Sequence, residues 1–210
     1  KCFASGILAG LFIGLGSFAF CACQAFINGK LYGSLLFAVG LFLVCLFNVN
    51  LFTGKIGFAI EATKQEGPLY FLQLLLMLAG NFVGAAGSGA LLNLALSGSD
   101  MIKAAVVIAN NRTSLGDGSQ PWYKALIMAF FCGVLVFLAV YIWKKADHFF
   151  VKTFGLVFCV WTFVVTGMEH CIANMFYYAF AGSWSIGLFL DVLLAILGNS
   201  LGALLVWTLF

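Results

Sequence analysis

The chain has 210 residues, of which 64% are hydrophobic and 8% are charged. Soluble domains carry about 25% charged residues, so the composition excludes a soluble globular protein and predicts an all-α polytopic membrane protein. The net charge of +3 comes without a long Lys/Arg cluster, which argues against nucleic acid as a partner. The seven cysteines form no CxxC pair, so we expect neither a disulfide framework nor a metal or cofactor.

The length accommodates about six membrane spans in one domain, because each span needs roughly 20–30 residues. The predicted spans are residues 2–27, 31–61, 69–96, 121–143, 149–180 and 184–210. Polar connections are predicted at 61–67, ahead of Pro68, and at 97–120. The chain begins at a span without a signal peptide, so we expect a soluble N-terminal segment to precede it.

The second predicted span is interrupted at residues 48–55, Asn-Val-Asn-Leu-Phe-Thr-Gly-Lys. Its asparagines, threonine and glycine offer local side-chain partners for the backbone and a hinge. The fifth span contains Glu169 and His170 inside a long apolar run, with Thr166-Gly167 just ahead of them. Ionisable groups at membrane depth usually line a pathway or make a polar contact. His170 is therefore either carried into a transport path by a broken helix or hydrogen-bonded to a neighbouring helix as a packing residue.

The chain also contains an internal repeat. Thr53-Gly54 in the second span corresponds to Thr166-Gly167 in the fifth, and Gly-Asn-x-x-Gly-Ala occurs at 80–85 and again at 198–203. The alternative is that this motif is only a helix-packing pattern. The repeat halves are about 1–96 and 121–210, and the odd number of crossings in each predicts that the second is inverted. Six Lys/Arg residues against four weakly favour a cytoplasmic N-terminus.

These residues resemble the formate/nitrite transporter family. The matching pieces are 6–16, 50–54, 80–85, 169–176 and 198–203, and Glu-His-x-x-Ala-Asn-Met-Phe at 169–176 is the most specific of them. The resemblance implies an aquaporin-like inverted 3+3 arrangement of six transmembrane helices, with helices 2 and 5 interrupted. It also implies a homopentamer with one pore in each protomer. The expected location is the inner (cytoplasmic) membrane, in contact with lipid and crossing it several times.

Site residues follow from the resemblance, position by position. His170 is the expected central pore histidine, and Thr53, on a loop formed by Leu51, Phe52 and Thr53, is expected to face it. Apolar constrictions are expected from Phe37, Leu41, Phe163 and Val136. Supporting polar residues are expected at Glu169, Asn174 and Asn199, and the vestibule charge at Arg112 or Lys124.

Three positions depart from the family pattern. Many members have Asn in the middle of span 4 where this chain has Gly133. Many have a vestibule Lys where this chain has Arg112, which attracts an anion but does not exchange its proton. Residues 116–118 look like extra length in that connection. Asp191 has no motif behind it and is interpreted as a helix partner or an interface residue.

The predicted function is a channel or transporter for a small monovalent weak-acid anion or its conjugate acid, such as formate, nitrite or hydrosulfide. Apolar constrictions solvate charge poorly. Protonating an acid of pKa ~3.7 at pH 7 costs roughly 4.5 kcal/mol, which is comparable with the cost of a bare charge at membrane depth. The solute therefore crosses either as the neutral acid or as an anion stabilised by Thr53, backbone amides and His170.

Three other classes remain as alternatives. The first is a neutral-solute channel for water, ammonia or a small polyol, which the same architecture would serve. An intramembrane enzyme using Glu169 and His170 is disfavoured, because adjacent residues point to different faces of a helix. A scaffold is disfavoured because two helix breaks cost stability without need.

Overall fold

The structure, a computed structural model, describes residues 1–26, 29–112 and 121–210, and the regular elements in these ranges are all helices. Within them, four helices are long and apolar enough to cross a membrane: α1 (Cys2–Phe26), α5 (Leu69–Ala95), α7 (Trp122–Lys145) and α10 (Ile186–Leu209). The predicted all-α fold with membrane-length helices is therefore confirmed.

Two further segments are divided into shorter helices. One consists of α2 (Lys30–Leu46), the short α3 (Phe52–Lys55), a 3₁₀ turn (Ile56–Phe58) and α4 (Ala59–Glu66). The other consists of α8 (Phe149–Val165) and α9 (Cys171–Ala181). The chain thus leaves helical geometry once between α2 and α3 and once between α8 and α9.

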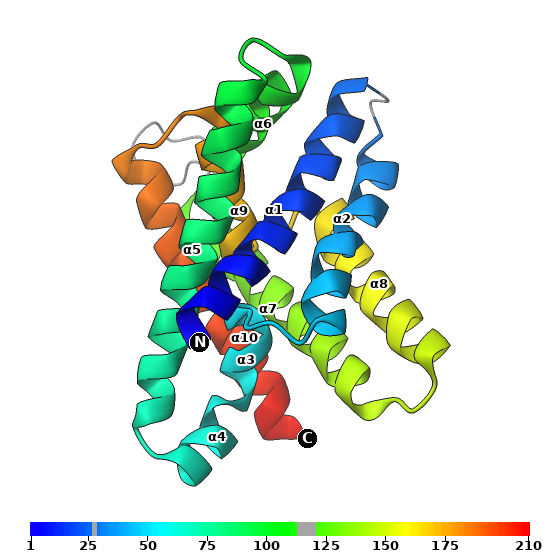
Figure 1. The fold of residues 1–210 in the computed structure, drawn as a ribbon, viewed down its shortest axis with the longest axis vertical. Coiled ribbons are helices and arrows are strands. Elements are labelled where there is room, and N and C mark those ends of the chain that lie inside the picture. Colours follow the sequence, from blue (N-terminus) through cyan, green and yellow to red (C-terminus); the bar gives the residue numbers. More distant parts are fainter. Residues whose placement is uncertain (27–28, 113–120) are drawn as a thin grey trace.

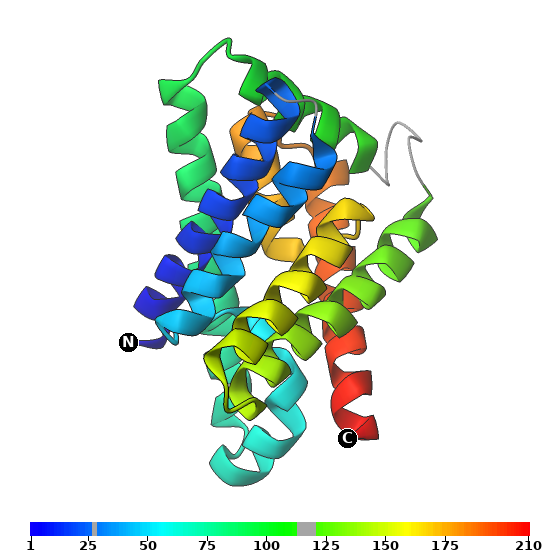
Figure 2. The same cartoon turned by 90° about the vertical axis from the view of Figure 1, so that its right-hand side faces the viewer.

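The long helices form two oppositely directed pairs. α1 packs along α5, and α7 packs along α10, while α2 and α8 pack against each other between the pairs. In Figures 1 and 2, α1 and α5 both run toward the end of the molecule where α6 lies, whereas α7 and α10 run toward the end where the C-terminus lies. Segments from the two halves of the sequence therefore meet at the centre of the bundle.

Two glycines allow these pairs to approach closely. A Cβ atom placed on Gly10 of α1 would lie 2.9 Å from the carbonyl carbon of Asn81 in α5. A Cβ atom on Gly133 of α7 would lie 2.7 Å from the carbonyl carbon of Asn199 in α10. Small residues at such crossings let helix backbones touch where lipid supplies no hydrophobic driving force. Gly133, expected from the family pattern to be a polar position, is instead a packing position.

The predicted polar connection at 97–120 contains a helix, α6 (Asp100–Arg112), which was not predicted from the sequence. It packs on α9 and α1, with Ala105 and Ala109 fully buried. Small residues on that face, an acidic residue in the first turn and a basic residue in the last turn favour the helix. The predicted polar segment 61–67 is likewise mostly helical, in α4. The predicted end of the first span at residue 27 and the extra length at 116–118 lie outside the described residues.

The two interruptions have the same backbone design. α2 ends with the Asn48 N–H bonded to the Cys45 carbonyl and the Val49 N–H bonded to the Val44 carbonyl. α8 ends with the corresponding bonds, from Gly167 to Val164 and from Met168 to Phe163. Asn48 and Gly167 both have positive φ, 50° and 76° respectively. Each helix is therefore closed by the same left-handed cap.

This geometry corrects the predicted interruption at 48–55 and the predicted pairing of Thr53-Gly54 with Thr166-Gly167. The non-helical stretches are residues 47–51 and 166–170. Thr53-Gly54 lies inside α3, whereas Thr166-Gly167 lies in the break, so the two pairs are not equivalent. Phe52 and Thr53 are likewise helical residues rather than loop residues.

Candidate functional site

Asn81 of α5 holds the first interruption together. Its side-chain oxygen accepts the N–H of Phe52, the first residue of α3, at 2.8 Å. Its amide nitrogen donates to the carbonyl oxygens of Gly6 and Asn50, both at 2.9 Å. One buried amide therefore satisfies backbone groups that a broken helix leaves without partners, which would otherwise be costly in a membrane.

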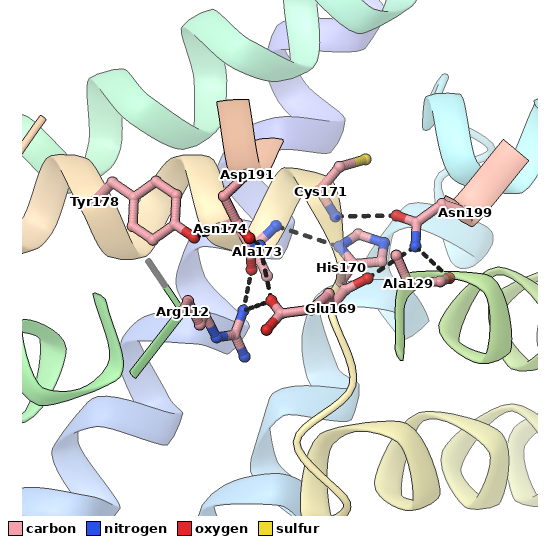
Figure 3. Close-up of polar contacts among 10 residues, drawn as sticks. All are labelled: Arg112, Ala129, Glu169, His170, Cys171, Ala173, Asn174, Tyr178, Asp191 and Asn199. Atoms are coloured by element: carbon pink, nitrogen blue, oxygen red, sulfur yellow. Dashed lines mark hydrogen bonds and ion pairs between the residues drawn. The ribbon is translucent and has the colours of Figure 1, made fainter. Parts of the chain in front are cut away.

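Asn199 of α10 does the same for the second interruption (Figure 3). Its side-chain oxygen accepts the N–H of Cys171, the first residue of α9, at 3.0 Å. Its amide nitrogen donates to the carbonyl oxygens of Ala129 and Glu169, both at 2.8 Å. Glu169 precedes Cys171 by two residues, as Asn50 precedes Phe52. The residues between them, His170 and Leu51, therefore occupy equivalent places.

His170 caps α9 and contacts the other interruption. Its Nδ1 accepts the N–H of Ala173 at 3.2 Å, and its Nε2 lies 3.0 Å from the Thr53 hydroxyl. Both side chains are almost fully buried. Because Nδ1 accepts a hydrogen bond, we infer a neutral imidazole that carries its proton on Nε2 and donates it to Thr53. The Thr53 hydroxyl can then donate in turn to a further acceptor.

Aromatic rings cover His170 on one side. The Phe163 ring stacks on the imidazole with centroids 5.8 Å apart, and Phe37 meets Phe163 edge-on, also at 5.8 Å. Leu41, Leu51 and Val136 are 2%, 2% and 1% exposed in the same core. Phe52 is buried there as well. The structure thus places Phe163 against His170 and Phe37 against Phe163, and the other predicted apolar residues in the same hydrophobic core.

Glu169 turns its carboxylate away from Asn199 and toward a polar cluster (Figure 3). Arg112, at the end of α6, approaches this carboxylate to 3.0 Å, and its guanidinium lies 5.2 Å from the centroid of the Tyr177 ring. Asn174 accepts from Arg112 and donates to Glu169 at 2.9 Å. Arg112, one of the two predicted vestibule cations, therefore forms an ion pair with Glu169. The Arg112 side chain is only 14% exposed to solvent.

Two further members of this cluster are Asp191, which the structure shows to be a helix partner as one of the two interpretations from the sequence had it, and Tyr178, which the sequence did not single out. Asp191 is fully buried on α10, accepting from Asn174 at 3.1 Å and from the hydroxyl of Tyr178. A lone acid in a long apolar helix is the only sequence signal for Asp191, and nothing in the sequence pairs it with Tyr178. Burial of two carboxylates beside one guanidinium makes every hydrogen bond in the cluster important for its stability.

A pocket lies on each side of the Thr53–His170 pair. The first, with a cavity volume of about 290 Å³, is bounded by Leu51 and Gly54. The second, of about 530 Å³, is bounded by Gly167 and Glu169 and also contains Lys124. Basic side chains line both: Lys55, Lys144 and Lys152 in the first, and Lys30, Arg112 and Lys124 in the second. Among the described residues, no group of three His, Cys, Asp or Glu side chains is placed to hold a metal ion.

Comparison with known proteins gives consistent matches. The family model described as formate/nitrite transporter matches residues 1–210. The formate channel FocA of Haemophilus influenzae is 27% identical over 83% of this chain and 64% of its own length. The transporter YrhG of Bacillus subtilis is 30% identical over 82% of this chain and 67% of its own length. The chain thus spans about two thirds of these relatives.

A solved structure of a pentameric formate channel with formate bound has the same fold. It superposes with a TM-score of 0.82 over the full length of this chain and 94% of that chain, at 22% identity.

Proposed function

The chain belongs to the formate/nitrite transporter family, and on that premise we propose that it conducts small monovalent weak-acid anions such as formate, nitrite or hydrosulfide. The family comprises multi-pass membrane channels and transporters rather than enzymes. The observation that carries the proposal is the buried Thr53–His170 hydrogen bond between two pockets lined by basic side chains. Cationic mouths attract anions, and an apolar closure between them selects against solutes that must stay charged.

We further propose that six spans cross the membrane as an inverted 3+3 repeat in a single domain, with halves at about 1–96 and 121–210. Opposite directions of the α1–α5 and α7–α10 pairs support this arrangement, as do the matching Asn81 and Asn199 bridges. A homopentamer in the inner (cytoplasmic) membrane is proposed from likeness to the pentameric formate channel and the bacterial relatives.

In the proposed path, an anion collects in either basic pocket and meets the closure formed by Phe37, Leu41, Leu51, Phe163 and Val136. A bare charge at this depth would cost several kcal/mol, which is comparable with the cost of protonation, so acidification favours the route through the neutral acid. For formate at pH 7 the protonation cost is roughly 4.5 kcal/mol, and it falls by about 1.4 kcal/mol with each unit of acidification. Flux should therefore rise as the pH falls.

We propose a specific part for His170 in this path, and its hydrogen bonds support it. Protonating Nδ1 would break the cap on α9, so the imidazole serves as a donor through Nε2 and Thr53 rather than as a carrier of the permeating proton. The chain Nε2–H to Thr53 Oγ1–H offers one polar contact to a solute oxygen or sulfur inside an apolar closure. The proton that neutralises the solute is then taken from water in the pockets.

The test is stopped-flow uptake into proteoliposomes with sodium formate, nitrite, hydrosulfide, acetate, chloride and glycerol, at pH 5.5 and 7.5. Selective uptake of weak-acid anions, faster at pH 5.5 for formate, is expected. Protein-free liposomes correct for leakage of the neutral acids. Permeation of glycerol or water alone would refute the proposal and place the protein among neutral-solute channels.

A further inference from the structure

The pocket that ends at Leu51 contains an unusual concentration of one charge. Lys55 of α3, Lys144 of α7 and Lys152 of α8 line a cavity of about 290 Å³, and no Asp or Glu is among its lining residues. Lysines from three elements thus line one cavity, and the like charges of Lys55 and Lys144 repel each other. A ligand that neutralises them would stabilise this arrangement.

The partners of these lysines differ from those of Arg112 in the opposite pocket. The ammonium group of Lys144 lies 3.7 Å from the centroid of the Phe58 ring. Its close partner is therefore an aromatic ring, in a cation–π contact, and not a carboxylate. Within the described ranges, the two ion pairs are Arg112–Glu169 and Lys103–Asp100, and neither involves this pocket. Within the described ranges Arg112 forms an ion pair, whereas the three lysines form none; Glu61, which is not among the lining residues, attracts Lys144 from beyond ion-pair distance.

The inner end of the pocket is apolar, and this limits which bound ions can move on into the pore. Leu51 is 2% exposed, Gly54 is buried, and Val44 and Val140 line the wall beside them. A monovalent anion escapes by protonation to a neutral acid, but a polyvalent oxyanion keeps charge at neutral pH after taking up one proton. Such an ion would be held by the three lysines and could not cross the apolar inner end of the pocket.

We propose that this three-lysine pocket binds a small polyvalent oxyanion of the phosphate type and that the bound ion blocks the pore from that side. The binding part depends only on the pocket. The blocking part rests on the proposed channel function.

Binding is measured by isothermal titration of the purified protein in nanodiscs of phosphatidylcholine with inorganic phosphate, against sodium chloride at equal ionic strength. Saturable phosphate binding is expected. Lys144→Gln, Lys55→Gln and Lys152→Gln should each raise the dissociation constant about tenfold, because each removes one charge-assisted contact. Lys145→Gln is the matched control, because Lys145 is the next residue in the same helix but is not among the lining residues.

Two results would overturn the binding proposal. One is the absence of phosphate binding beyond that of chloride, and the other is an equal effect of Lys145→Gln and Lys144→Gln. Repeating the titration in nanodiscs with phosphatidylglycerol separates a free ion from a lipid headgroup. Unchanged affinity supports the free ion, whereas loss of phosphate binding there assigns the pocket to the headgroup and refutes the free-ion assignment.

The block is tested by formate uptake with phosphate present at a single face of the protein, in liposomes with oriented insertion. We expect phosphate to inhibit formate uptake only from the side on which the three-lysine pocket opens, and we expect Lys144→Gln to relieve this inhibition. Equal inhibition from both faces, or none from either face, would refute the block. If no weak-acid uptake is seen at all, the channel proposal fails while the titration still decides whether the pocket binds phosphate.

Discussion

The interruption at Leu51 and the interruption at His170 share a backbone but differ in side-chain chemistry. Each follows a left-handed cap, each is bridged by an asparagine from a long helix, and each begins a new helix two residues after a bridged carbonyl. In the first, the chain carries Asn50 and Leu51, and in the second it carries Glu169 and His170. The backbone arrangement is therefore duplicated, while the second interruption alone carries an acid and a histidine, which pair with Arg112 and Thr53.

The largest difference between the interruptions is the ion pair of Glu169, because Asn50 has no charge at the equivalent place. Arg112→Gln should destabilise the protein by about 3–5 kcal/mol, since it leaves Glu169 buried without its cation. The double variant Arg112→Gln/Glu169→Gln should regain most of this loss. The measurement is the free energy of unfolding in mixed micelles. A double variant as unstable as the single one would show that Arg112 acts through its packing on Tyr177 instead.

The two bridging asparagines should matter almost equally. Asn81→Ala and Asn199→Ala each leave a buried backbone N–H and two carbonyls without the side-chain partner, at a cost of about 2–3 kcal/mol. Asn93→Ala is the control, because the Asn93 side chain donates a hydrogen bond to the Phe180 carbonyl, and its loss should cost about 1 kcal/mol. Thermal unfolding of the three variants measures this. A difference above 2 kcal/mol between the Asn81 and Asn199 variants would contradict the equivalence of the two bridges.

The sequence indicated the correspondence of the two Gly-Asn-x-x-Gly-Ala strings and an interruption at His170, because both depend on short strings. Gly-Asn-x-x-Gly-Ala at 80–85 and 198–203 couples a close helix approach to a buried amide, and both requirements are local. The charged and polar residues at 169–174 are likewise conspicuous in an apolar span. The predicted alignment of the two breaks was wrong, because Thr-Gly occurs in both segments. Thr53-Gly54 lies in a helix, whereas Thr166-Gly167 lies in a turn.

The Tyr178–Asp191 hydrogen bond beside Glu169 could not be predicted, because it is set by tertiary packing. Asp191 and Tyr178 are separated by 13 residues and by a chain reversal, and neither belongs to a recognised string. α6 was missed because its sequence is only weakly apolar and its packing on α1 and α9 supplies much of its stability. From the sequence, Gly133 was interpreted as the loss of a polar residue. The structure shows that it is a packing position, because a Cβ atom there would meet the Asn199 backbone.

Making the two interruptions alike tests whether His170 acts in the proposed permeation. His170→Leu copies the first interruption into the second and removes the donor to Thr53. Formate flux should fall about 30-fold, equivalent to about 2 kcal/mol for one lost hydrogen bond in an apolar closure. Leu51→Met is the matched control and should change flux less than threefold, because it preserves an apolar side chain of similar volume. Stopped-flow uptake measures both, and equal rates for His170→Leu and wild type would exclude a role in permeation.

The caps that end α2 and α8 provide the smallest and most direct comparison, because Asn48 and Gly167 differ only in the side chain at a left-handed position. Gly167→Ala should lower the free energy of unfolding by about 1–2 kcal/mol, since its φ of 76° strains a Cβ atom even though the nearest neighbour, the Lys30 ammonium, would lie 3.7 Å away. Gly167→Asn should cost less than Gly167→Ala, because asparagine tolerates this conformation. Asn48→Gly should be neutral or stabilising by about 0.5 kcal/mol. If Gly167→Ala were as stable as wild type, the strain would be relieved by a shift of the α8 cap, and the two caps would no longer be equivalent.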